Sequence, residues 1–123
     1  MSELAQVTIE ASGDVALARL RGEVDLSNAE DVLELILEGA VNQPGPGLVV
    51  DLSQTLYIDS AGIRVLFELR ERLEALGKRV RVVVPEAASI RRVMELAGAA
   101  KALDIDSTLP AALAAMAADE ERS

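Results

Sequence analysis

Residues 57–66 read YIDSAGIRVL and place one hydroxyl beside one carboxylate at the start of an amphipathic pattern. The hydroxyl belongs to Ser60 and the carboxylate to Asp59, and the next two residues, Ala61 and Gly62, are very small. A strand-like apolar run ends just before them, so the hydroxyl lies at a strand-to-helix junction, where open α/β sheets commonly bind ligands. Ser60 can cap the helix by accepting hydrogen bonds from its first amides. Because a helix start also accommodates a phosphate, Ser60 is equally suited to be a phosphoacceptor.

The composition argues against Ser60 as a catalytic nucleophile. The chain has no histidine and no cysteine, and a serine needs a neighbouring base to activate it. The two lysines, Lys78 and Lys101, have no motif around them, and the G-x-S-x-G elbow is absent. Neither of the common glycine-rich phosphate motifs occurs. We therefore predict no catalytic residues, no enzyme activity and no cofactor, and we interpret Ser60 as a substrate.

Several acids fall near the ends of expected strands and could surround Ser60. Asp25 and Asp51 are the main candidates, together with Glu23. Carboxylates that converge in this way can bind magnesium. No recognised metal motif is present, so solvated loop acids are the favoured interpretation and no metal site is predicted.

Arg64 follows Ser60 by four residues, which places both side chains on one helix face. It can pair with Glu68 one turn further on. Alternatively, it can make a charge-assisted hydrogen bond to a phosphate on Ser60.

The overall charge limits the classes of partner. The chain of 123 residues has a formal net charge of −9 and only 2% aromatic residues. An acidic chain lacks the basic surface that nucleic acids and anionic membranes require, so we predict neither as a partner. A basic protein partner is compatible with this charge. The acidic N-terminus has no secretory core, and the longest apolar run, residues 111–118, is too short to span a bilayer. We expect a cytoplasmic protein.

The elements that must position Ser60 follow from hydrophobic periodicity. Ser27 and Glu30 have the spacing of a capping box at the start of the first helix. Within the expected helices, the inward-facing sets include Leu35, Leu76, Val93, Met94 and Leu96 or Ala97. Ser107 or Asp106 could cap the last helix. The expected strands are 4–9, 15–22, 48–53, 79–84 and 102–105. The expected helices are 29–42, 61–76, 86–97 and 108–119. Strands that alternate with helices imply one α/β domain over residues 1–119, and residues 120–123 are expected to fray.

These segments resemble the STAS domain family, named for sulphate transporters and anti-sigma factor antagonists. The resemblance depends on LRGEVDLSNAE at residues 20–30, LVVDLS at 48–53, YIDSAGIRVL at 57–66 and RVRVVV at 79–84. It implies a mixed β-sheet, mostly parallel with an N-terminal antiparallel hairpin, and about four helices packed largely on one side.

The resemblance also implies a function. In anti-sigma factor antagonists of this family, the serine after the aspartate is phosphorylated by an anti-sigma factor with serine kinase activity. The unphosphorylated protein binds that kinase and frees a sigma factor, and a serine phosphatase resets the switch. Ser60 would be the phosphoacceptor. Its expected surroundings are Asp59, Ala61, Gly62, Arg64, Asp25, Ser27, Asn28 and Asp51.

Two features leave the partner open. Many antagonists have Ser or Thr after the serine and Leu-Gly after the glycine, whereas this chain has Ala61, Ile63 and Arg64. An alternative function is a constitutive cytoplasmic STAS subunit that binds the ATPase of a lipid or toluene-tolerance transporter, in which Ser60 is never modified.

Overall fold

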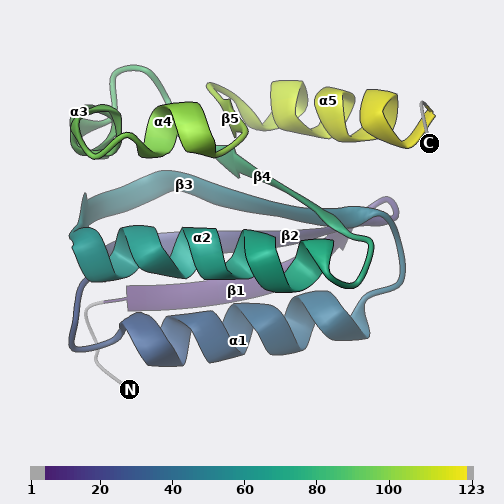
Figure 1. Cartoon of the computed structure of the whole chain (residues 1–123), viewed down its shortest axis with the longest axis horizontal. Coiled ribbons are helices and arrows are strands. Elements are labelled where there is room, and N and C mark those ends of the chain that lie inside the picture. Colours follow the sequence, from purple (N-terminus) through teal and green to yellow (C-terminus); the bar gives the residue numbers. More distant parts are fainter. Residues whose placement is uncertain (1–4, 122–123) are drawn as a thin grey trace.

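A mixed sheet carries the elements that surround Ser60 (Figure 1). The computed structural model describes residues 5–121, which form five strands and five helices. The strands are β1 (Ala5–Ser12), β2 (Val15–Val24), β3 (Gly47–Ile58), β4 (Arg79–Val83) and β5 (Ile105–Asp106). The helices are α1 (Ala29–Asn42), α2 (Ser60–Glu74), α3 (Ser89–Leu96), α4 (Ala99–Ala102) and α5 (Leu109–Glu121).

The strands lie in the sheet in chain order, β1-β2-β3-β4-β5. The β1–β2 pair is antiparallel, and every other pair is parallel. Gly13, with φ of 63°, makes the tight turn of the hairpin, a conformation that glycine adopts without steric cost. The predicted mixed sheet with an N-terminal hairpin is confirmed.

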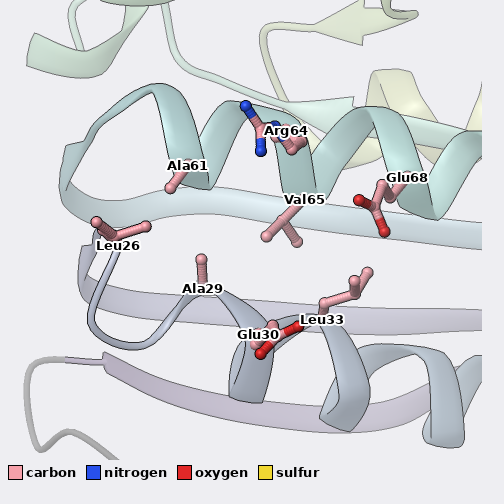
Figure 2. A pocket seen from close by; sticks show the side chains of 8 residues that line it. All are labelled: Leu26, Ala29, Glu30, Leu33, Ala61, Arg64, Val65 and Glu68. Carbon is pink, nitrogen blue, oxygen red and sulfur yellow. The ribbon is translucent and has the colours of Figure 1, made fainter.

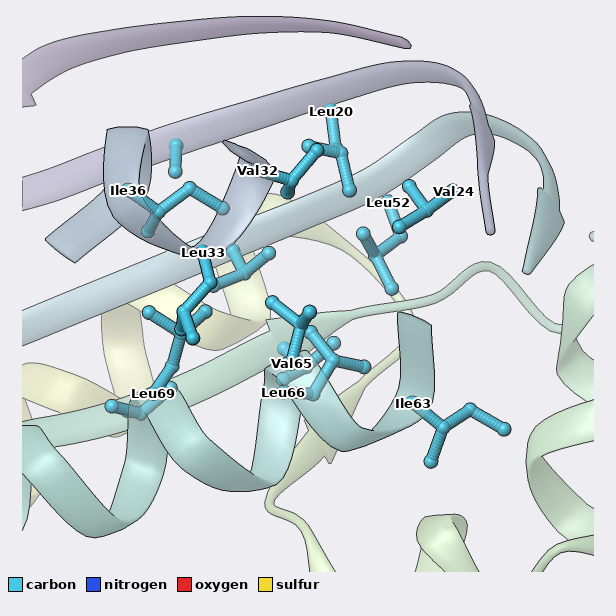
Figure 3. Packing of buried hydrophobic residues seen from close by; sticks show 14 of the residues in the cluster. Leu20, Val24, Val32, Leu33, Ile36, Leu52, Ile63, Val65, Leu66 and Leu69 are labelled. Carbon is cyan, nitrogen blue, oxygen red and sulfur yellow. The ribbon is translucent and has the colours of Figure 1, made fainter. Parts of the chain in front are cut away.

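Alternate residues of the strands build two separate cores. Ala18, Leu20, Val50 and Leu52 belong to the larger core, which also contains buried residues of α1, α2, α3 and α4. Figure 3 shows the part of this core where α1 and α2 pack on β2 and β3. On the opposite face, Leu17, Val49 and Val83 pack with Ala112 and Met116 of α5. Four of the five helices therefore cover one side of the sheet, as predicted.

Three details differ from the predicted elements. The strand expected over 48–53 continues to Ile58, so Ser60 comes almost directly after its end. The third helical region divides at Gly98, whose φ of 77° lies outside the helical range, and this gives five helices rather than about four. α5 is capped by Thr108, which accepts a hydrogen bond from the Ala111 amide, rather than by Ser107 or Asp106.

Four side chains expected in the core are exposed: Leu35 by 40%, Leu76 by 59%, Val93 by 41% and Leu96 by 73%. On α1 the inward position is taken by Leu33, and α2 ends at Glu74, before Leu76. Met94, expected to face inward together with Val93, is buried. The expected frayed tail, residues 120–123, overlaps α5, whose backbone is helical to Glu121, and residues 122–123 lie outside the described residues. Within residues 5–121, no helix combines the length and the apolar character needed to cross a membrane.

A partly buried ion cluster attaches α5 to the sheet. Arg81 on β4 donates to both carboxylate oxygens of Asp106 on β5, at 2.7 and 3.3 Å, and to Asp119 on α5 at 3.3 Å. The hydrogen bonds to Asp106 raise the pKa of Arg81 above its ordinary value, against a smaller opposing effect of burial. Its stabilising effect would be lost only as the pH rises through that raised pKa, so it is constant around neutral pH.

We expect Arg81→Ala to lower the free energy of unfolding by about 3 kcal/mol, because it leaves two neighbouring carboxylates without their shared cation. Urea denaturation measures the change. Arg72→Ala is the matched control: it breaks an exposed pair with Glu68 and should cost at most about 0.5 kcal/mol. Equal losses in the two variants would show that the cluster adds nothing beyond an ordinary surface pair.

Candidate functional site

Ser60 lies where the carboxyl ends of two parallel strands meet. Val24 and Ile58 are partners in the β2–β3 register, and the Asp59 amide donates to the Val24 carbonyl at 3.2 Å. The turn that leads from β2 into α1 therefore lies beside the junction between β3 and α2.

Asp59 connects the two segments through its carboxylate. One oxygen, Oδ1, accepts hydrogen bonds from the amides of Ala61 at 2.9 Å and Gly62 at 3.1 Å. The other, Oδ2, accepts from the Leu26 amide at 3.2 Å. Asp59 has extended backbone angles and is the N-cap of α2. The prediction that Ser60 caps this helix is therefore wrong.

Ser60 is the first residue of α2 and is exposed. Its hydroxyl makes no hydrogen bond to any residue within 5–121. The Asp59 cap holds the backbone at this helix start, and the Ser60 hydroxyl stays available for reaction. This arrangement presents an oxygen atom at a defined position on the surface, which is what a modifying enzyme needs.

The neighbouring turn is rigid. Asp25 Oδ1 accepts from the amide of Ser27 at 2.9 Å and from its hydroxyl at 2.5 Å. Asn28, which is 1% exposed, accepts from the Asp25 amide and donates to the Glu23 carbonyl. Because Asp25 takes the Ser27 hydroxyl, the predicted capping box with Glu30 does not form, and Asn28 occupies the N-cap position of α1.

The two small residues after Ser60 have different roles. Gly62 is buried, and a Cβ added there would lie 2.5 Å from Cγ1 of Ile58 and 3.1 Å from the Val24 carbonyl oxygen. Its small size lets α2 start against the strand ends, so it serves packing rather than access. Ala61 is partly exposed, and its short side chain adds little bulk beside the Ser60 hydroxyl.

The structure does not bring Asp51 to Ser60. Asp51 lies within β3, seven residues before Ile58, which corresponds to about 23 Å of extended chain. Its carboxylate accepts from the amide and hydroxyl of Ser53. It lines a separate hollow with Arg19 and Leu109, near the start of α5. Within residues 5–121, no three acids are grouped so that they could hold a metal ion.

Arg64 is exposed on α2, one turn after Ser60. Glu68 pairs instead with Arg72, one turn further on, at 3.5 Å. Among the ion pairs of the described part of the chain, none joins Arg64 to Glu68. Arg64 borders a groove of about 270 Å³ between α1 and α2 (Figure 2).

Sequence reasoning missed the exposed apolar residues that precede Ser60 in the chain or lie in the neighbouring turn. Leu26, in the turn before α1, is 83% exposed; Leu56 and Tyr57, at the end of β3, are 72% and 48% exposed. A leucine between aspartate and serine in a turn is a usable signal, because such a residue has no core to enter. Together with Ser60, these side chains give the site an apolar margin of the kind found at protein interfaces.

Known proteins similar to this chain were found by sequence and by structure. The family model described as STAS domain matches residues 6–112. The anti-sigma-F factor antagonist RsfB of Mycobacterium tuberculosis is 33% identical over 108 residues, which cover 87% of this chain and 85% of that protein. The crystal structure of an anti-sigma factor antagonist from Mycobacterium paratuberculosis has a TM-score of 0.80 at 28% identity, covering 91% and 93% of the two chains. Unphosphorylated SpoIIAA has a TM-score of 0.70 at 19% identity, covering 88% and 93%, and shares the fold.

The assignment of the cap can be tested by two neighbouring substitutions. Asp59→Ala should lower the free energy of unfolding by about 1–2 kcal/mol and speed hydrogen exchange at the Leu26, Ala61 and Gly62 amides, because all three lose their acceptor. Ser60→Ala should change stability by less than about 0.5 kcal/mol. Chemical denaturation and amide exchange measured by NMR give both quantities. A larger loss of stability in Ser60→Ala than in Asp59→Ala would show that Ser60 is the N-cap of α2.

Proposed function

Because this chain belongs to the STAS domain family, we propose that it is an anti-sigma factor antagonist switched by phosphorylation of Ser60. In the unphosphorylated state it binds an anti-sigma factor that is also a serine kinase, and a sigma factor is released. The kinase transfers the terminal phosphoryl group of ATP to Ser60 Oγ, and ADP leaves. A serine phosphatase hydrolyses the phosphate and restores binding.

The observation that carries the proposal is the exposed Ser60 hydroxyl, without a hydrogen bond in the described chain, on a helix start that Asp59 fixes. Asp59 is the adjacent carboxylate, and its two oxygens already accept from three amides. It is therefore poorly placed to remove the serine proton. The base that activates Ser60 has to come from the partner, which suits a substrate rather than an enzyme.

The exposed apolar side chains suit a surface that a partner covers. Leu26, Leu56 and Tyr57 come from the two segments that flank Ser60. Aromatic and apolar side chains of this size are typical of the buried centre of an interface. A phosphate on Ser60 would then lie inside or at the edge of the contact area.

The phosphate can act through charge alone. It adds about −1.5 to −2 beside Asp59 on a chain of formal net charge −9. At the first residue of a helix this charge is favoured by the helix dipole, so the antagonist itself keeps its fold. When the partner binds, it must either desolvate the phosphate or lie close to its negative charge. A resulting penalty of about 3 kcal/mol in binding free energy weakens binding more than a hundredfold.

A pull-down from the native cell, with mass spectrometry of residues 57–72, tests the identity of the partner. We expect an ATPase-like kinase as partner and phosphate on Ser60. A transporter ATPase as the sole partner, with Ser60 never modified, would contradict the proposal in favour of the constitutive transporter subunit.

The charge mechanism is tested by a pair of variants that differ only in charge. With the kinase purified from that pull-down, Ser60→Asp should weaken binding by about a hundredfold and Ser60→Asn by less than about fivefold. Isothermal titration calorimetry measures both. Equal weakening by Asp and Asn would indicate a steric effect, and undiminished binding of Ser60→Asp would remove the switch.

Arg64 is positioned to contact the phosphate from the next turn. We expect the titration of phosphorylated Ser60, followed by ³¹P NMR, to move up by about 0.3 pH unit in Arg64→Ala, because an i,i+4 ion pair contributes about 0.4 kcal/mol. Arg72→Ala, two turns further along the same face, is the control and should leave the titration unchanged. An unchanged titration in Arg64→Ala would show that Arg64 does not touch the phosphate.

A further inference from the structure

A groove between α1 and α2 begins at Ala61, the residue that follows Ser60. Its apolar walls are Ala29 and Leu33 of α1 and Ala61 and Val65 of α2, and Leu26 stands at one end (Figure 2). The groove has a volume of about 270 Å³, enough for one or two apolar side chains. Ala61 is adjacent to Ser60 in the chain, so the groove and the phosphoacceptor form one continuous surface.

Leu26 is presented in a fixed position. Its side chain is 83% exposed, while its amide donates to Asp59 and the surrounding turn is held by Asp25 and Asn28. An apolar side chain on a rigid turn loses little conformational entropy when a partner buries it. Such a side chain is suited to be an anchor of an interface.

The outward side of α1 has one sign of charge. Glu30, Asp31, Glu34 and Glu38 are all exposed, and α1 contains no basic residue. None of the four takes part in an ion pair among the described residues. Like charges four residues apart weaken a helix, so Glu30, Glu34 and Glu38 carry a cost within the free protein. A cationic partner would convert that cost into attraction.

We propose that this groove receives an amphipathic, basic helix of the kinase partner. This inference rests on the proposed function and names the surface that the partner recognises. The apolar side of the helix lies between α1 and α2 against Leu26, and its cationic side chains face Glu30, Glu34 and Glu38. Arg64, on the α2 side of the groove, repels those cations and so sets the orientation of the helix. The three glutamates span about 12 Å, the length of two helical turns.

An NMR titration tests the groove without the kinase. The probe is a 14-residue amphipathic peptide with leucines spaced three and four apart and with Lys and Arg on one side. Ser60→Ala protein serves as the target, so the result does not depend on phosphorylation. We expect shifts at the amides of Ala29, Leu33, Ala61 and Val65, and at least tenfold weaker binding of a permuted peptide of identical composition.

Four exposed positions supply the variants. Leu26→Ser should weaken binding of the amphipathic peptide by about tenfold, and Glu34→Lys with Glu38→Lys by a similar factor. Asp14→Lys, in the β1–β2 turn, makes the charge change of one of the two glutamate substitutions and should have less than about a twofold effect. If the lysine pair disturbs the spectrum of the free protein, Glu34→Gln with Glu38→Gln replaces it, with a smaller loss expected.

Each contrary result has a defined meaning. Equal binding of the permuted peptide, or an equal loss in Asp14→Lys, would reduce the effect to net charge and overturn the proposal. Shifts of the same amides by anionic phosphatidylserine vesicles would reassign the groove to a membrane. The kinase from the pull-down must displace the peptide, and failure to do so would remove the kinase as the occupant. If the peptide binds but Ser60 is never phosphorylated in the cell, the groove is supported as a binding site and the phosphorylation switch is refuted.

Discussion

The site depends on one carboxylate that accepts hydrogen bonds from two separate segments. Asp59 holds the amides of Ala61 and Gly62 at the start of α2 and the amide of Leu26 before α1. Both segments follow parallel strands, so they would be close in any fold of this topology, but closeness alone does not fix their relative position. The carboxylate does so while leaving the Ser60 hydroxyl unengaged. Asp59 accepts from backbone amides and not from side chains. The residues that carry those amides can therefore be substituted without loss of these hydrogen bonds.

Much of the fold follows from simple patterns. The alternation in residues 15–22 and the apolar runs at 48–53 and 79–84 specify strands, and two helices with clear apolar faces specify crossovers. The location of Ser60 at a strand-to-helix junction follows as well. The identity of the cap does not, because aspartate and serine are both good N-caps and stand side by side. The backbone of Asp59, which is extended and whose amide donates to the Val24 carbonyl, decides between them.

Other differences arise where two local interactions compete for one group. Ser27 has the spacing of a capping box, yet its hydroxyl goes to Asp25, which is closer in the turn. Asp51 is a strand-end acid only if β3 stops near Ser53; the strand continues to Ile58 and moves the end of the strand away from it. Leu33 and Leu35 are both leucines of α1, and it is Leu33 that enters the core beside Val32 and Ile36. Such choices depend on tertiary packing and cannot be read from local spacing.

The buried Gly62 divides the site into positions that can change and one that cannot. Any side chain there would meet Ile58 and the Val24 carbonyl, whereas Ala61, Arg64 and Leu26 face solvent or the groove. Duplicated copies of such a gene can therefore diverge in recognition without refolding, since the residues that choose a partner are not those that hold the loop. If Ser60 is the phosphoacceptor, as proposed, a few surface substitutions can separate the partners of two such copies in one cell while Ser60 stays in place.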